Sequence, residues 1–129
     1  MMQDTIRQVL EIAIYSGRIM LENGAETYRV EETINRICAS LDIHVESFVI
    51  PTGIFVSYNH ETRDYSYVRR IRHIHIDLEA IGMINDFSRN FVAGKYTPDD
   101  AKEQLDKIRY APRFSAPLVI FFGGLSGGF

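Results

Sequence analysis

The chain has 129 residues, of which 46% are hydrophobic and 24% are charged, and its formal net charge is −3. This length favours one domain with a core that is stable without disulfide bonds, and the composition is typical of globular proteins. The negative net charge argues against a general nucleic-acid-binding protein, because such proteins usually carry a basic excess. The single cysteine, Cys38, excludes an internal disulfide and a zinc site built from cysteines.

Two helices are predicted first, over about residues 4–22 and 25–41, because apolar residues recur there at a spacing near 3.6. Gly17 lies inside the first pattern and predicts close contact with a neighbouring element. Asn23-Gly24 separates the helices, since Gly24 suits the left-handed conformation that ends a helix. So short a connection favours an antiparallel helical hairpin. Cys38 lies on the apolar stripe of the second helix and is predicted to be a buried hydrophobe rather than a nucleophile.

Three strands are expected next, because the apolar period changes from 3.6 to 2 after Asp42. They should cover residues 44–50, 54–58 and 65 to about 74. The turn Pro51-Thr52-Gly53 separates the first strand from the second. The polar residues 59–64 form the loop between the second strand and the third. Short connections favour an antiparallel meander with one face packed on helices.

Two further helices are predicted, the first with Asp77 as its cap. Its apolar side comprises Leu78, Ile81, Ile84, Phe87, Phe91 and Val92, and Gly94 ends it. Residues 97–100, TPDD, are a strong helix start, and the last helix should reach about Tyr110. The order is therefore ααβββαα. We expect an α+β domain over residues 1–111, with a small antiparallel sheet packed on helices.

The C-terminal residues differ from the rest, because no residue from Ala116 to Phe129 is charged. A membrane-spanning helix needs about 20 apolar residues, so we interpret residues 118–129 as the start of a truncated transmembrane helix after a linker at 112–117. A terminal strand docked in the core is the alternative. Lys107, Arg109 and Arg113 precede this stretch and would place the domain on the cytoplasmic side.

The span at residues 22–32 is the first candidate site, because several charged residues lie close together there, next to the turn at Asn23-Gly24. Its carboxylates, Glu22, Glu26, Glu31 and Glu32, could include an acid/base pair, although carboxylates on helices are usually solvated. Glu32 and Arg36 are expected to form an ordinary exposed ion pair.

Three other groups of residues could carry chemistry, and each also has a structural explanation. His73 and His75 should project from one face of a strand and could begin a metal site or lie in solvent. The basic run of Arg69, Arg70 and Arg72 could be an anion site, a lipid-headgroup contact or a solvated edge strand.

The turn at residues 51–53 is the third such group. The Thr52 hydroxyl and the Gly53 amide could bind a small ligand there. Turn chemistry alone also explains the proline and the glycine.

Residues 23–31, NGAETYRVE, and 51–55, PTGIF, resemble the signature of the N-terminal domain of the threonine/serine exporter family. Residues 77–79 and 84–89 are similar to that family's helical segment, and the likeness runs from about Val9 to the C-terminus. The resemblance implies a cytoplasmic domain of a bacterial inner-membrane exporter of threonine, serine or small dicarboxylates. It implies the membrane and a transmembrane bundle as partners, in the same chain or in another subunit. We expect a homo-oligomer, no cofactor and no nucleic acid.

The resemblance also implies a ligand-sensing or hydrolase-like site, because the residues of its motifs are polar. The candidates are Glu26, Thr27, Arg29, Glu31 and Thr52, joined by Asn85 and Ser88 on one face of the third helix. Arg29 is the natural partner for a ligand carboxylate, because a guanidinium can hold one through two hydrogen bonds. We favour binding or gating over a small soluble hydrolase that uses carboxylates of residues 22–32. A structural oligomerisation module is the third hypothesis.

Overall fold

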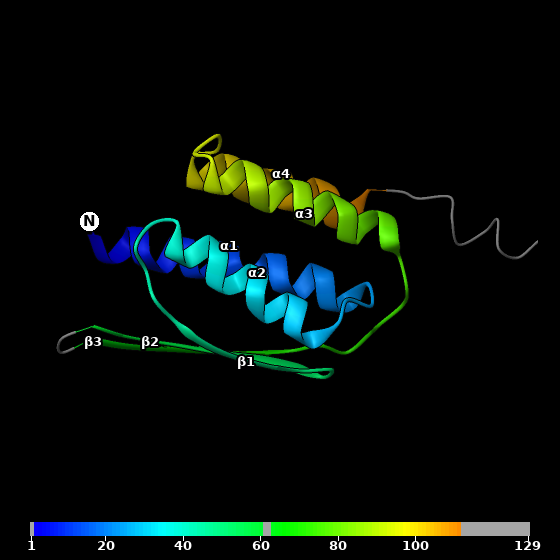
Figure 1. The fold of residues 1–129 in the computed structure, drawn as a ribbon, viewed down its shortest axis with the longest axis horizontal. Coiled ribbons are helices and arrows are strands. Elements are labelled where there is room, and N and C mark those ends of the chain that lie inside the picture. Colours follow the sequence, from blue (N-terminus) through cyan, green and yellow to red (C-terminus); the bar gives the residue numbers. More distant parts are fainter. Residues whose placement is uncertain (1, 61–62, 112–129) are drawn as a thin grey trace, which may run out of the picture.

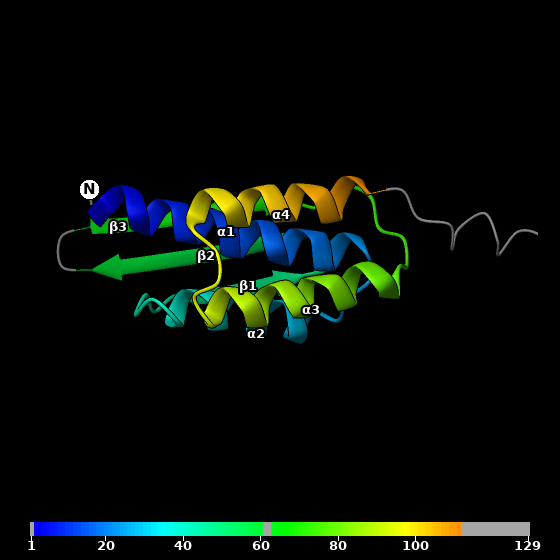
Figure 2. The same ribbon diagram turned by 90° about the horizontal axis from the view of Figure 1, so that it is seen from above.

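Three layers build the domain in the computed structural model, which describes residues 2–60 and 63–111 (Figure 1). In this part of the chain the order is α1 (Met2–Glu22), α2 (Thr27–Ala39), β1 (Glu46–Ile50), β2 (Gly53–His60), β3 (Arg63–Arg70), α3 (Leu78–Val92) and α4 (Pro98–Tyr110). Helices α1 and α2 form the middle layer. The sheet lies on one side of them and α3 and α4 on the other (Figures 1 and 2). The predicted α+β class and the ααβββαα order are confirmed.

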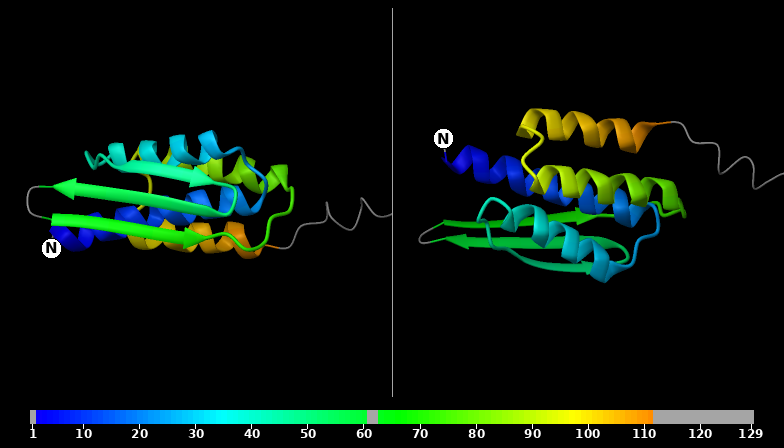
Figure 3. Two further views of the ribbon diagram at one scale, coloured as in Figure 1. Left: turned by 90° about the horizontal axis from the view of Figure 1, so that it is seen from below. Right: turned by 45° about the horizontal axis from the view of Figure 1, so that its top comes forward.

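The strands form an antiparallel sheet in the order β1-β2-β3, as predicted. Ile54, Val56 and Tyr58 of β2 are buried against the helices. The opposite face of the sheet is not covered by any helix of the described residues (Figure 3). Phe55 lies on that face between Phe48 and Val68, its partners on the neighbouring strands.

The prediction that the third strand reaches Ile74 is wrong, because β3 ends at Arg70. Arg70 pairs with Gly53, the first residue of β2, so the chain beyond Arg70 has no strand beside it. The alternating pattern continues through His73 and His75, but these residues lie in an irregular segment and not on a strand. The second strand also differs from its prediction. It extends to His60, into the predicted polar loop at 59–64.

Helix α1 is buried on several sides, because it contacts α2, α3, α4 and β2. A helix at the centre of a domain is expected to be apolar on most of its surface. The buried residues of α1 include Val9, Leu10, Ile12, Ala13, Ile14, Ile19, Met20 and Leu21. The prediction for Gly17 is confirmed, since a Cβ atom there would lie 2.8 Å from Ile34 Cδ1 and 3.0 Å from Val30 Cγ1 of α2.

The predicted helix caps are confirmed. The Asp77 carboxylate accepts hydrogen bonds from the backbone N–H groups of Glu79 and Ala80, and Thr97 Oγ1 accepts one from Asp100. The predicted apolar face of α3 is only partly correct, because Leu78 and Val92 are 74% and 41% exposed. Both are terminal residues of the helix, beyond the central turns that pack on α1 and α2.

Residues 112–129 lie outside the described residues, and they include the predicted linker and the predicted start of a membrane helix. Among the helices at 2–60 and 63–111, none combines the length and the apolar character needed to cross a bilayer.

The packing at Gly17 predicts opposite effects for two glycine substitutions. Gly17→Leu should lower the free energy of unfolding by about 1–3 kcal/mol, because the added atoms overlap Ile34 and Val30. Gly82→Ala in α3 should raise it by about 0.5–1 kcal/mol, since a Cβ atom there meets nothing and alanine favours helix. Urea denaturation followed by circular dichroism measures both. Equal effects of the two substitutions would contradict the close approach of α1 and α2.

The prediction that Cys38 is a buried hydrophobe is confirmed, and burial raises the pKa of its thiol to about 12. We expect iodoacetamide to leave Cys38 unmodified in the folded chain at about pH 8.5 and to modify it fully in urea, because only the thiolate reacts. Ala39→Cys is the matched control, since position 39 is exposed. Equal rates of alkylation at positions 38 and 39 in the folded chain would refute the assignment. Mass spectrometry measures both.

Candidate functional site

The turn between α1 and α2 is held at one end of the molecule by backbone hydrogen bonds to a distant segment. Gly24 adopts a φ of 93°, and the buried Asn23 donates from Nδ2 to the Ile19 carbonyl at 2.7 Å. The His75 N–H donates to the Glu22 carbonyl and the Asp77 N–H to the Asn23 carbonyl, each at 3.0 Å. Residues 71–77 therefore fix the position of the turn.

The same segment brings the turn between β1 and β2 to this end of the molecule. The Ile71 N–H donates to the Thr52 carbonyl at 2.9 Å, and the Thr52 side chain is exposed. Four residues of the predicted site thus lie at one end: Glu26, Thr27, Arg29 and Thr52. Glu26 precedes α2 and makes no side-chain capping bond, Thr27 is half-buried, and Arg29 is exposed.

Glu31 joins α2 to the sheet. Its Oε2 accepts a hydrogen bond of 2.9 Å from the backbone N–H of Val49 in β1. Strand β1 is at the edge of the sheet, where such N–H groups could otherwise pair with another strand. Glu31 therefore contributes to positioning and protecting β1.

Asn85 and Ser88 lie on α3, and Asn85 is half-buried. Ser88 is fully buried, and its Oγ accepts a hydrogen bond of 3.3 Å from Arg36 of α2. Arg36 also forms the predicted ion pair with Glu32, at 3.7 Å. Ser88 therefore connects α3 to α2, and the seven predicted residues occupy three separate places.

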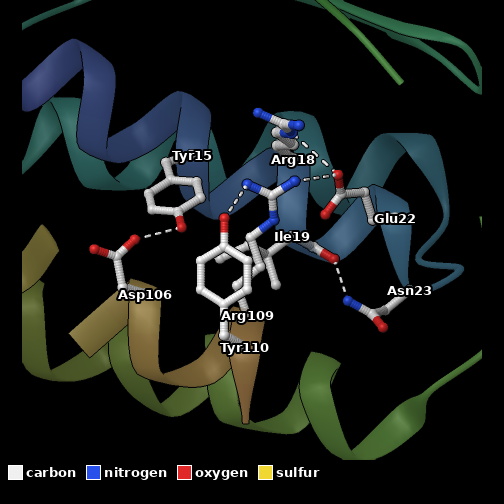
Figure 4. A network of polar contacts seen from close by, with 8 residues as sticks. All are labelled: Tyr15, Arg18, Ile19, Glu22, Asn23, Asp106, Arg109 and Tyr110. Carbon is white, nitrogen blue, oxygen red and sulfur yellow. Dashed lines mark hydrogen bonds and ion pairs between the residues drawn. The ribbon is translucent and has the colours of Figure 1, made fainter. Parts of the chain in front are cut away.

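A polar network that we did not predict connects α1 to α4 (Figure 4). Glu22 Oε2 accepts from Arg18 Nε at 3.0 Å and from Arg109 Nη2 at 3.1 Å. The Tyr15 hydroxyl donates to Asp106 Oδ1 at 2.6 Å. Sequence spacing indicates only the Arg18–Glu22 pair, four residues apart on one helix. The other two contacts join residues 87 and 91 positions apart.

The network changes the acidity of its members. Burial, with the bond to Asp106, raises the pKa of Tyr15 to about 12. The hydrogen bond from Tyr15 lowers the pKa of Asp106. Burial acts to lower the pKa of Arg109, but the Glu22 carboxylate together with Tyr15 and Tyr110 outweighs burial, and the pKa is raised. Arg109 is thus a stable cation in the last turn of α4, close to the end of the described chain.

A cleft of about 380 Å³ lies beside this network, between α1, the end of β3 and the start of α4. It is lined by Gln8, Glu11, Ile12, Ile14, Tyr15, Arg18, Arg69, Pro98, Asp99 and Lys102. Three of these residues are cationic and two are anionic. A small ligand that carries both an anionic and a cationic group could therefore find a partner for each charge.

The contacts of the span at 22–32 do not support the hydrolase hypothesis. Glu22 is paired with two arginines, Glu31 with a backbone N–H, and Glu32 with Arg36. Within residues 2–60 and 63–111 no group of three or more His, Cys, Asp or Glu residues is arranged to hold a metal ion.

Comparison of the sequence with models of protein families found a match. A family model described as "Putative threonine/serine exporter" matches residues 11–129. This match covers most of the chain and confirms the resemblance inferred from the motifs at 23–31 and 51–55. Neither a search of curated proteins nor a search of solved structures returned a match.

The bond between Tyr15 and Asp106 predicts a pH-dependent effect of Tyr15→Phe. The substitution should lower the free energy of unfolding by about 1 kcal/mol at neutral pH. The pKa of Asp106 is depressed, so its contribution is present above pH 3.8 and is lost as the pH falls further. The pKa of Tyr15 is raised, so its contribution is present below pH 10.0 and is lost as the pH rises toward about 12.

Urea denaturation across the pH range measures this difference. Tyr110→Phe is the matched control, because Tyr110 is 69% exposed. Within this network its hydroxyl accepts a hydrogen bond from the neighbouring Arg109 alone. A Tyr15→Phe effect no larger than that of Tyr110→Phe would contradict the role assigned to the bond.

Proposed function

Because the chain belongs to the threonine/serine exporter family, we propose that the described domain is the cytoplasmic part of a bacterial inner-membrane exporter. There it binds a small amino acid or small carboxylate and gates transport. The observation that carries the proposal is the position of Arg18, which lines the cleft and also belongs to the network that reaches Arg109.

The charges around the cleft favour a small zwitterion. Arg18, Arg69 and Lys102 can hold a carboxylate, and Glu11 and Asp99 can hold an ammonium group. The cleft volume of about 380 Å³ suits a ligand of amino-acid size. A dicarboxylate such as succinate would satisfy the cations and leave the anionic residues without a partner.

Gating follows from competition for Arg18. In this structure, Arg18 and Arg109 share one oxygen atom of Glu22. A ligand carboxylate that binds Arg18 weakens the Arg18–Glu22 contact and thereby changes the strength of the Glu22–Arg109 ion pair. The domain then has two states, one with the Arg18–Glu22 contact intact and one with it broken. The ligand can shift the position of α4 only if it binds these two states with different affinity.

The cytoplasmic side is supported by the basic residues near the end of α4. Lys107 and Arg109 lie in its last turn, and Arg113 follows in the sequence before the uncharged stretch. Basic residues flanking a membrane segment favour the cytoplasmic side. The membrane segment at 118–129, a transmembrane bundle as partner and a homo-oligomer are parts of the same proposal.

A second location for the ligand is the end of the molecule that carries Glu26, Thr27, Arg29 and Thr52. Arg29 is exposed there and can approach a carboxylate without losing an ion pair within the described contacts. The two locations make different predictions for substitutions.

Calorimetric titration with threonine, serine and succinate distinguishes these locations. Arg69→Gln and Lys102→Gln should each weaken binding of threonine or serine by about 10–100-fold, the value of one charge-assisted hydrogen bond. Arg29→Gln should leave the affinity unchanged, as should Lys95→Gln, which is exposed between α3 and α4. Succinate should bind more weakly than threonine.

The opposite pattern, with loss only in Arg29→Gln, would move the ligand to the end of the molecule. If the parent chain binds none of the three compounds, the ligand-binding proposal fails.

A further inference from the structure

The fold joins two motifs that are separate in the sequence, the turn at Thr52 and the basic run at 69–72. Gly53 pairs with Arg70, and the Ile71 N–H donates to the Thr52 carbonyl. Together they line a shallow depression of about 610 Å³ at the open face of the sheet. Its cations are Arg69, Arg70 and Arg72, and its apolar side chains include Ile50 and Phe55.

Two exposed isoleucines lie on the segment that leads away from this depression. Ile74 is 49% exposed and Ile76 is 79% exposed. The backbone on both sides of Ile76 is bonded to the turn between α1 and α2, through the N–H groups of His75 and Asp77. A Cβ atom at Gly24 would lie only 3.2 Å from Ile76 Cγ1. The segment is therefore fixed with an apolar side chain in solvent, an arrangement that typically marks an interaction surface.

The turn between β1 and β2, the segment between β3 and α3, and the last turn of α4 lie at the same end of the molecule (Figures 1 and 3). Glu22 connects these parts, because its carbonyl accepts from His75 and its carboxylate from Arg109 of α4. Tyr110 follows Arg109 and is 69% exposed. The sequence beyond this point becomes uncharged from Ala116 onward.

We propose that this end of the molecule lies against a bilayer surface that contains anionic phospholipids. Arg70 and Arg72 contact headgroup phosphates, which a guanidinium binds through two hydrogen bonds. Ile74 and Ile76 enter the interface, where arginine side chains can extend past apolar neighbours to reach phosphates. This inference rests on the membrane location in the proposed function, and it adds which face of the domain contacts lipid.

Tryptophan fluorescence tests the contact, because the chain contains no tryptophan of its own. The full chain carrying Ile76→Trp is mixed with vesicles of phosphatidylglycerol and phosphatidylcholine, with or without bromine on the acyl chains. We expect a blue-shifted emission and at least about twofold quenching by the brominated lipid, as for a side chain in the interface. Val92→Trp is the matched control, since Val92 is exposed at the opposite end of α3. Its emission should not be quenched.

Charge substitutions test the role of the arginines. Arg70→Gln with Arg72→Gln should reduce quenching of the Ile76→Trp reporter on phosphatidylglycerol vesicles, with about tenfold weaker partitioning. On pure phosphatidylcholine the double substitution should have no effect. Lys95→Glu is the control for net charge. Inorganic phosphate at millimolar concentration should not displace the chain from vesicles, and displacement would instead indicate a site for a free anion and overturn the proposal.

The outcomes separate this inference from the proposed function. If the chain floats with vesicles but the Ile76→Trp reporter is not quenched, the face is wrong and the membrane location stands. A blue-shifted but unquenched emission would indicate contact with protein and would also overturn the inference. If the chain does not float, the membrane location fails as well. Circular dichroism establishes that each variant is folded, and Ile74→Trp is a second reporter should Ile76→Trp unfold.

Discussion

Helix α1 lies between the sheet and the pair α3–α4, and this central position is the constraint on which the other layers depend. Its apolar residues face several directions, so that α2, β2, α3 and α4 each bury a surface against it. Gly17 lets α2 approach closely enough to complete the middle layer. Because α1 is rigidly packed along its length, the polar groups at its C-terminal end are held in fixed positions.

Glu22 is the residue through which that end of α1 acts on the rest of the domain. Its carbonyl fixes the segment before α3, and its carboxylate binds the last turn of α4. One residue thus contacts the segment that carries the exposed isoleucines and the helix that leads toward the uncharged C-terminal stretch. A change in the charge around Glu22 would therefore affect both parts, and this is the physical basis of the gating that we propose.

The two concave surfaces differ in charge, and this difference separates their proposed ligands. The cleft beside α4 has cations and anions, as a zwitterion requires. The depression on the sheet has cations only among its charged lining residues, as a phosphate requires. Arg69 belongs to both linings, so the two sites are close neighbours at the end of β3.

The sequence by itself determined the class and the order of the elements, because helix periodicity, strand alternation and the caps at Asp77 and Thr97 are local properties. It also identified the family, through short motifs at two turns. It could not determine where β3 ends, because the alternating pattern continues past Arg70 and only the length of β2 decides the last pair.

The candidate site shows the same division. Sequence reasoning identified Glu22, Thr52 and the arginines at 69–72 as noteworthy, but not their partners. Only the tertiary structure brought Arg109 to Glu22, Asp106 to Tyr15, and Thr52 to the arginines. It also gave Glu31 and Ser88 contacts that join elements. The reason is physical: these contacts join residues far apart in the chain, and packing around α1 sets their distances, which no local pattern of residues encodes.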